Sequence, residues 1–470
     1  MKRKINSSIV CLILTLFFTL ALVQGGAVAA DAGQASQRRT AISAVTISSP
    51  DLLTLARAKR IALENSPTLA SALERVSQAR EAVAQAKADR LPTLSATAGC
   101  DYTEATDNSA SDYDETLYTS QLSATQVLFD GFYRKYTQLS AQYGEQISQA
   151  ARDEVRNLLA WSVAQAYLNV QLARENIKIA ESDMAFNQAQ ANEAVAKEKS
   201  GSGSYSDVLN FKSKVNSAKS AMLSSRQDLV ESLHGLAALL GYKDARLPQG
   251  MTIVPLEAES ADMESAEVET TTMPLESLDA NMEELLGQRP DLERAGLAVD
   301  QAEAGIRMAR AGYYPIISLT GGYGTSAGDD FTDTDDMGAF LGISVSIDIF
   351  SGGATRSRVR EALSAKREYE QDLAEARISA VSDIRSSAQA TATAREQLAL
   401  QQENTSLIQT TRDLVEKEYG AGQASLVRLN EAQNDLVGAM GDLAIAKVSL
   451  ILALENFDYY TGMNVKAERQ

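Results

Sequence analysis

The sequence is poor in residues that break helices or cross-link chains. It contains eight Pro, two Cys and one His in 470 residues, and aromatic residues make up only 6%. No proline lies within residues 93–247 or 316–470. Because proline interrupts helices, these two stretches suit very long helices. The low aromatic content argues against a conventional thick core.

The cysteine and histidine content leaves little room for site chemistry. Cys11 lies in an N-terminal apolar run, so Cys100 is the only cysteine expected in the mature chain and cannot form an internal disulfide. We expect Cys100 to be a buried or lipid-facing thiol. His234 lies in a helical pattern and suggests a surface or packing role. No zinc-protease motif, cysteine pair or phosphate loop is present, so we expect no enzyme activity, no catalytic or metal site and no cofactor.

The N-terminus has the pattern of a secretory signal peptide, predicted at 1–29. Basic residues at Lys2–Lys4 precede the apolar run Ile9–Val23, and Ala27–Ala29 resembles a cleavage site. A flexible segment, 30–50, is expected to follow. Beyond the signal we find no run of about 20 apolar residues, so we expect no transmembrane helix and any membrane crossing by β-strands. The net charge of -18 disfavours nucleic-acid binding and suits a secreted or periplasmic surface.

The chain is built from a duplicated unit. The same landmarks return in the same order 223 residues later, and 221 residues later beyond the first predicted hairpin. The pairs are Pro67 with Pro290, Pro92 with Pro315, Phe129 with Phe350, Gly201 with Gly422 and Gly241 with Gly462. Each copy is too long for a solenoid repeat, which indicates two fused half-proteins. We predict repeats at 51–242 and 278–462, an acidic linker or equatorial region at 243–277 and a C-terminal tail at 463–470.

Each repeat contains a predicted β-hairpin, at about 93–129 and 316–350. Apolar and small polar residues alternate strictly over Thr93–Tyr102, as in a strand with a different environment on each face. An ordinary sandwich hairpin with one wet face would give the same pattern. We favour membrane strands because about 10 residues match a tilted span.

The hairpin tips carry two further features. The acidic clusters 107–115 and 329–336 lack the ligand spacing of a calcium loop, so we expect solvated external loops. Four aromatic residues lie at the loop-side ends of the strands, where an aromatic girdle at a lipid–water boundary is typical. They are Tyr102, Tyr118, Tyr323 and Phe340.

Heptad spacing predicts coiled helices after each hairpin, at 131–200 and 204–240 and again at 352–419 and 423–460. The first would be roughly 100 Å long. Two glycines in each turn allow the chain to reverse direction. They are Gly201 and Gly203 in the first copy and Gly420 and Gly422 in the second.

Four strands are too few to close a barrel. About eight are needed, and open edges in lipid would leave backbone groups without hydrogen bonds. Several chains must therefore contribute strands. Two chains would give eight strands around a filled interior, and three would give twelve around a lumen. Small residues on the inward face, such as Ser95, Gly99 and Ser344, favour the open lumen.

Four short motifs in order give the sequence a family resemblance. They are Gln288–Leu292, Tyr314–Pro315, Phe350–Gly353 and the Tyr419–Gly422 turn. With the duplication, they make the chain similar to the TolC-like outer-membrane efflux protein family over nearly the whole mature length. The resemblance implies a mainly α-helical homotrimer of a Gram-negative bacterium. It would have a twelve-stranded outer-membrane β-barrel, four strands per chain, and a periplasmic coiled-coil tunnel closed at its tip.

The resemblance also implies a function and partners. The chain would be the passive exit duct of a tripartite efflux or type I secretion system, carrying small molecules or proteins. It would work with a periplasmic adaptor and an inner-membrane pump of RND or ABC type, and its strands would contact outer-membrane lipid. A structural or adhesive coiled-coil trimer without transport is the alternative. The duplicated hairpins favour the duct, because an adhesin needs no such strands.

The family's tip contacts map onto four positions. Asp207 falls at an acidic position and Tyr419 at the tyrosine that bonds to such an aspartate. Arg428 and Glu431 fall at positions that often form an acidic ring, so Arg428 departs from the pattern. An Arg428–Glu431 pair would neutralise itself or link neighbouring chains. Alternatively these residues are solvated surface charges.

Overall fold

The structure is a computed structural model that describes residues 51–105, 113–255, 275–325 and 337–463. The predicted signal peptide, the segment 30–50, most of both acidic loops, the centre of the linker and nearly all of the tail lie outside these residues.

The chain divides into two compact units. The smaller unit comprises Met1–Leu52 and Gly250–Thr252, and all its described residues except Gly250 belong to strands β1 (Asp51–Leu53) and β4 (Met251–Ile253), which form a two-stranded sheet. The larger unit comprises Leu53–Gln249 and Ile253–Gln470, and it contains every other element.

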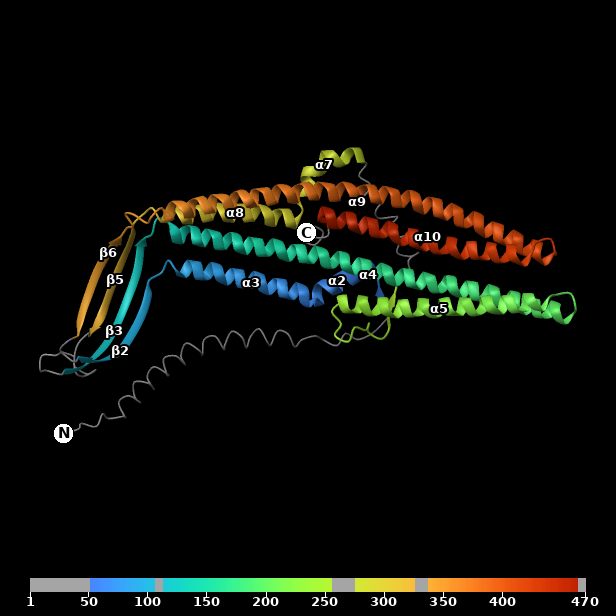
Figure 1. Ribbon diagram of the computed structural model, residues 1–470, viewed down its shortest axis with the longest axis horizontal. Helices are drawn as coiled ribbons and strands as arrows, with labels where there is room; N and C mark the ends of the chain where they lie inside the picture. Colours follow the sequence, from blue (N-terminus) through green and yellow to red (C-terminus); the bar gives the residue numbers. More distant parts are fainter. Residues whose placement is uncertain (1–50, 106–112, 256–274, 326–336, 464–470) are drawn as a thin grey trace, which may run out of the picture. The chain divides into compact units, whose positions relative to one another are not determined.

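The larger unit repeats one order of elements twice (Figure 1). Each half runs two helices, two strands, a long helix and a returning helix. The first half consists of α2 (Leu55–Asn65), α3 (Pro67–Ala88), β2 (Thr93–Ala105), β3 (Tyr113–Phe129), α4 (Tyr133–Lys199) and α5 (Tyr205–Leu239). The second consists of α7 (Leu275–Gly287), α8 (Pro290–Ala311), β5 (Ile316–Thr325), β6 (Gly338–Ser346), α9 (Ala354–Gly420) and α10 (Leu426–Thr461).

Local signals set the helix starts. Pro67 occupies the first turn of α3, and the Ser66 hydroxyl accepts a hydrogen bond from the Leu69 amide. The Thr54 hydroxyl accepts one from the Arg57 amide, so α2 begins at Leu55.

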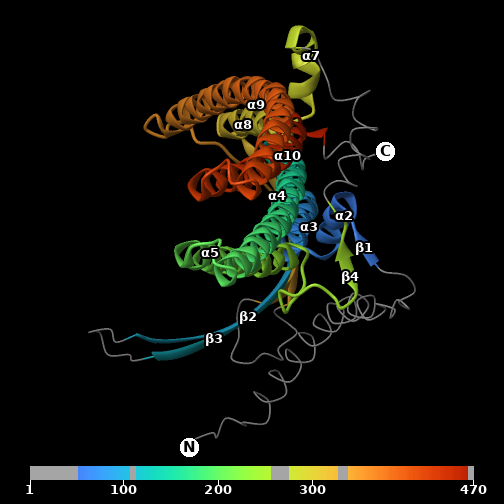
Figure 2. The same ribbon diagram turned by 90° about the vertical axis from the view of Figure 1, so that its right-hand side faces the viewer.

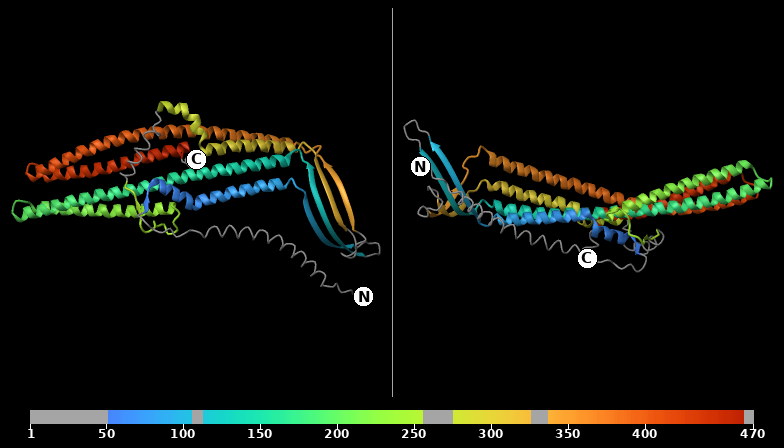
Figure 3. Two further views of the ribbon diagram at one scale, coloured as in Figure 1. Left: turned by 180° about the vertical axis from the view of Figure 1, so that it is seen from behind. Right: turned by 90° about the horizontal axis from the view of Figure 1, so that it is seen from below.

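The two long helices, of 67 residues each, exchange partners along their length. On the sheet side the neighbours run α3, α4, α8, α9, which matches the strand order β2-β3-β5-β6. On the opposite side they run α5, α4, α10, α9 (Figures 1 and 3). The layer of helices therefore continues the sheet, with α3 and α5 along one edge and α9 along the other.

The four-stranded sheet is antiparallel and has two unlike faces. Residues paired in register across one face are apolar or small, for example Leu122 with Tyr323 and Gly321 with Leu341. Leu341 on this face is 77% exposed. The other face carries hydroxyl groups, and Ser95 Oγ lies 2.8 Å from Ser123 Oγ. Nothing within the described chain covers the apolar face, as expected if that face meets lipid.

The register changes one part of the predicted aromatic girdle. Tyr323 pairs with Ala339 and shares the apolar face with Leu122. Phe340 pairs with Gly322, and its ring lies over the Gly322 backbone, on the hydroxyl-bearing face. Because side chains alternate along a strand, Phe340 cannot join a girdle on the apolar face. For the other two girdle residues the structure gives the backbone register alone, with Tyr102 opposite Thr116 and Tyr118 opposite Cys100.

One described helix, α10, is long and apolar enough to cross a membrane by length and composition. It contains an 18-residue window of mean hydropathy 1.8, although charged residues interrupt it and no unbroken run of about 20 apolar residues occurs. The helix packs against both α9 and α4, and 39% of the window is buried. It also buries Glu455, 5% exposed, in an ion pair with Lys59 of α2. These contacts account for the buried part of the apolar surface of α10, because two of its faces pack against neighbouring helices.

A pair of glycines marks the duplication in space. Gly241 ends α5 with φ +82°, and a Cβ there would lie 2.6 Å from the Asn65 carbonyl oxygen. Gly462 ends α10 with φ +75°, and its Cβ would lie 2.6 Å from the Gln288 carbonyl oxygen. Each returning helix therefore closes against the same backbone junction of its own half.

We expect Gly241→Ala and Gly462→Ala to destabilise the chain by about 1–3 kcal/mol each, because the left-handed backbone and the close carbonyl both oppose a Cβ. Thermal unfolding in detergent, followed by helical circular dichroism, measures the change. Gly438→Ala is the matched control, because a Cβ at Gly438 in α10 meets nothing within 4 Å. The control should be neutral or slightly stabilising. Equal melting temperatures for Gly462→Ala and Gly438→Ala would contradict this account.

Candidate functional site at the helical tip

The end of the larger unit away from the sheet is formed by two tight turns between helices. Gly201 and Gly422 adopt φ +76° and +74°, and their amides donate to the Glu198 and Tyr419 carbonyls, each at 3.0 Å. Only glycine enters this conformation without strain. The next helices start with serine caps, Ser204 for α5 and Ser425 for α10.

The other two predicted turn glycines have different surroundings. A Cβ on Gly203 would lie 2.8 Å from the Lys197 Cβ, so a larger residue would push the turn away from α4. Gly420 is the last residue of α9 and has open space around it. All four glycines are exposed. The turns therefore present a small-residue surface at the extreme end of the helices.

Beneath the turns, one apolar cluster joins all four helices. Its largest member is Phe211 of α5, which is fully buried. The Tyr419 ring of α9 packs on Phe211 edge to face, with the ring centroids 6.4 Å apart. The other buried members are Ala191, Ala194, Val208, Val215, Val415, Leu429 and Ala432. Figure 2, which views the larger unit from this end, shows the α4–α5 and α9–α10 pairs that the cluster connects.

A polar group lies beside this cluster and brings Asp207 and Tyr419 together. Burial raises the pKa of the Tyr419 phenol, and the negative charge of Asp207 raises it further. The Lys197 ammonium lies 5.2 Å from the centre of the Tyr419 ring, a cation–π contact. A hydrogen bond to Glu193, at 2.8 Å, raises the pKa of Lys197, with smaller contributions from Tyr419 and Asp207.

The arrangement differs from the expected tip contacts in two respects. Among the described contacts no hydrogen bond joins Asp207 to Tyr419, and Lys197 lies on the ring instead. Sequence reasoning missed Lys197, although its place in the last turn of α4, just before Gly201, was an available signal.

Arg428 also has a partner other than the one considered. Its Nη1 lies 3.2 Å from Glu418 Oε2, so the ion pair joins the start of α10 to the end of α9 across the turn. The proposed Arg428–Glu431 pair is not formed. In the described part of the chain, neither Asp207 nor Glu431 has an ion-pair partner within 4.0 Å, and Glu431 is exposed. Two carboxylates per chain therefore remain available at this end.

A second polar layer lies farther from the tip, between α4 and the α9–α10 helix pair. Gln433 of α10 donates to Asp183 Oδ1 at 2.8 Å, and Asn187 donates to the same atom at 3.0 Å. Gln190 donates to Glu416 of α9 at 3.0 Å. Asn187 and Gln433 are 3% and 6% exposed. Polar layers weaken a helix interface relative to apolar ones, so this region separates more easily than a leucine seam.

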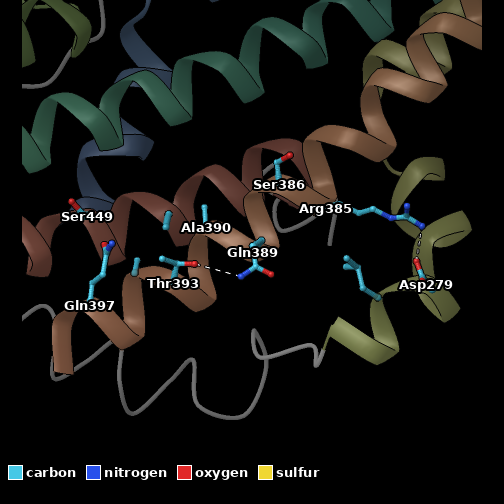
Figure 4. Close-up of a pocket in the computed structure, with 11 residues that line it drawn as sticks. Asp279, Arg385, Ser386, Gln389, Ala390, Thr393, Gln397 and Ser449 are labelled. Atoms are coloured by element: carbon cyan, nitrogen blue, oxygen red, sulfur yellow. Dashed lines mark hydrogen bonds and ion pairs between the residues drawn. The ribbon is translucent and has the colours of Figure 1, made fainter. Parts of the chain in front are cut away.

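A groove lined by α7, α9 and α10 has a volume of about 880 Å³ (Figure 4). An ion pair between Arg385 and Asp279, 2.9 Å long, lies at one side. Gln389 and Thr393 contribute amide and hydroxyl groups that contact each other. None of these side chains forms a nucleophile–base pair. The described residues also contain no cluster of three or more metal-ligating side chains.

Comparison with known proteins gives a consistent result. The family model described as "Outer membrane efflux protein" matches residues 58–242 and 281–462, one match for each half. The alkaline protease secretion protein AprF of Pseudomonas aeruginosa is 25% identical over 87% of this chain and 84% of its own length. The cation efflux system protein CusC of Escherichia coli O157:H7 is 27% identical over 80% of this chain and 78% of its own.

Solved structures agree in fold. The open state of the MtrE outer membrane channel of Neisseria gonorrhoeae covers 91% of this chain and 95% of its own, with a TM-score of 0.74 and 20% identity. The Campylobacter jejuni CmeC outer membrane channel gives a TM-score of 0.72 at 17% identity, over 87% of this chain and 85% of its own. With both halves matched by the family model, the chain belongs to the outer membrane efflux protein family and acts as an export channel of the outer membrane.

Proposed function

We propose that three copies of the chain form one conduit, with twelve strands in the outer membrane and the helices continuing as a periplasmic tunnel. The supporting observation is the four-stranded sheet, in which β2 and β6 each have a partner on one side only within the described chain. Open strand edges in lipid would cost several kcal/mol for each bare backbone group. Twelve strands leave a lumen, and the small polar residues on the hydroxyl-bearing face suit a wet interior.

We propose further that the tip is the closed end of this conduit. Within each chain the Phe211 cluster and the Lys197–Tyr419 contact join the α4–α5 helix pair to the α9–α10 helix pair. The Arg428–Glu418 ion pair stabilises the turn within the α9–α10 pair. Asp207 and Glu431, which lack ion pairs in the described chain, are the groups available to neighbouring copies. Opening then requires the α4–α5 pair to separate from the α9–α10 pair. The polar layer at Gln433 lowers the free-energy cost of that separation.

The partners in this proposal are a periplasmic adaptor and an inner-membrane pump of RND or ABC type. The exposed turns at Gly201 and Gly422 are the adaptor contact, because they are the farthest points from the sheet in the larger unit (Figure 1). Relatives of similar identity are named for secretion of a protease and for efflux of cations. The duct is therefore common to several cargo classes, and the pump selects between small molecules and proteins. These relatives offer no support for a purely structural or adhesive trimer.

Light scattering on the detergent-extracted chain, corrected for bound detergent, tests the assembly. We expect a protein mass of three mature chains, together with a stable single-channel current in a planar bilayer. The current is expected because three chains close the sheet around a lumen. A folded protein with the mass of one chain or two chains would contradict the twelve-stranded assembly.

A further inference from the structure

Exposed apolar and basic side chains meet where the sheet joins the helices. Ile349 and Phe350, which follow β6, are 94% and 88% exposed. Arg356 and Arg360, in the first two turns of α9, are also exposed. Neither arginine has an ion pair in the part of the chain that the structure describes. This order of apolar and then basic residues is typical of a segment that leaves a membrane.

Contacts between the helix ends fix the position of these arginines. A Cβ on Gly312, the C-cap of α8, would lie 3.1 Å from Thr355 Cγ2, so Arg356 lies directly at the junction. Exposed aromatic residues surround the same level. Phe129 packs edge to face on Phe132 and Tyr314, with centroid distances of 5.5 and 6.3 Å. Phe132 and Tyr314 are 54% and 51% exposed. The Tyr314 ring is amphipathic, with an apolar body and a polar hydroxyl, and tyrosines of this kind mark a lipid–water interface.

The geometry of α9 places its first three arginines, Arg356, Arg358 and Arg360, on two different faces of the helix. Thr355, which is buried, and Lys366, whose ammonium lies 3.0 Å from Glu303 of α8, mark the side of α9 toward α8. At 3.6 residues per turn, Arg356 and Arg360 lie roughly 100° and 140° around the helix from Thr355. Arg358 lies on the opposite side, about 60° in the other direction. Arg356 and Arg360 therefore share one face.

The helix itself does not stabilise these cations. The first turn of α9 contains no acidic residue, and the helix dipole disfavours positive charge at this end. In a chain with a net charge of -18, two unpaired arginines beside an exposed apolar rim point to an external anion.

We propose that Arg356 and Arg360 bind the phosphate groups of anionic lipids in the leaflet where the apolar face of the sheet ends. The inference rests on the proposed insertion of the sheet in the membrane. Guanidinium groups pair with phosphate oxygens through two parallel hydrogen bonds, and their stems extend along apolar surface. Phe350 and the aromatic residues at the junction, Phe129, Phe132 and Tyr314, contact the adjoining acyl chains. The arginine face thereby fixes the depth of the sheet in the bilayer.

The test uses the full detergent-extracted chain and native mass spectrometry, which counts bound lipids. Phosphatidylglycerol is titrated against phosphatidylcholine, and inorganic phosphate is added as a competitor. We expect Arg356→Gln/Arg360→Gln to weaken phosphatidylglycerol binding about 25-fold, roughly fivefold per arginine, with phosphatidylcholine unaffected. The matched controls are Arg358→Gln, on the opposite face, and Lys212→Gln/Lys219→Gln, exposed residues of α5. Both controls should retain wild-type binding, and inorganic phosphate should not compete.

Four results would overturn the inference. They are an unchanged affinity in the double variant, an equal loss in Arg358→Gln, competition by inorganic phosphate, and a loss of oligomer mass in the double variant without lipid. The last would show that the arginines join copies of the chain. Wild-type conductance is measured in parallel. Normal conductance without lipid preference contradicts the lipid site alone, whereas a failure to insert and conduct contradicts the proposed function.

Discussion

Phe211→Ala is expected to give a several-fold higher and more fluctuating single-channel conductance. Phe211 is fully buried where α4, α5, α9 and α10 meet beneath the tip turns, and Tyr419 packs on its ring. Truncating a buried phenylalanine costs about 3–5 kcal/mol. Here most of that loss weakens the contact between the α4–α5 pair and the α9–α10 pair, which the proposed closed state requires. The closed state should therefore be less populated relative to states in which these two helix pairs are separated.

The measurement is current through purified protein in a planar bilayer, with oligomer mass and helicity checked beforehand. Leu209→Ala is the matched control, because Leu209 lies two residues away on α5 and is 50% exposed. It should leave the current unchanged. Phe211→Leu keeps most of the volume and should fall between wild type and Phe211→Ala. If folded Phe211→Ala protein conducts as wild type does, the tip cluster does not hold the duct closed.

Lys59→Met is expected to lower stability by about 3 kcal/mol. Lys59 Nζ and Glu455 Oε2 are 2.5 Å apart, and their side chains are 18% and 6% exposed. Removing the lysine leaves a carboxylate buried between α2 and α10 without its counter-ion. Replacing both partners by apolar residues removes the unpaired charge. Lys59→Met/Glu455→Leu should therefore recover most of the loss or exceed wild-type stability.

Thermal unfolding of the two variants and of Glu455→Leu alone completes the cycle. Lys178→Met is the matched control, because the Lys178–Glu175 pair lies on the surface and Lys178 is 52% exposed. It should change stability by less than about 1 kcal/mol. A double variant as unstable as Lys59→Met would show that Lys59 acts through packing and not through its charge.

Local and periodic features were determined by the sequence alone. The heptad spacing, the glycine turns and the Ser66–Pro67 start signal each act over a few residues, so the long helices and their reversals could be predicted. The strand alternation was equally local, and the duplication gave each prediction a second, independent instance. Together with the family motifs, these features were enough for the mainly helical fold and for the export function.

Only the tertiary structure decided which side chains meet. Sequence spacing suggested Arg428 with Glu431, but the turn brings Arg428 back to Glu418. Lys197 and Tyr419 are more than 200 residues apart, so no local pattern could pair them. Strand register placed Phe340 on the face opposite Tyr323.

The same limit applies to α10, whose composition alone resembles a membrane span. Its burial against α4 and the ion pair of Glu455 with Lys59 depend on contacts between segments hundreds of residues apart. Periodicity specifies how each segment folds. Contact between distant segments depends on how the long helices are packed, because that packing decides which faces are covered and which charges are paired.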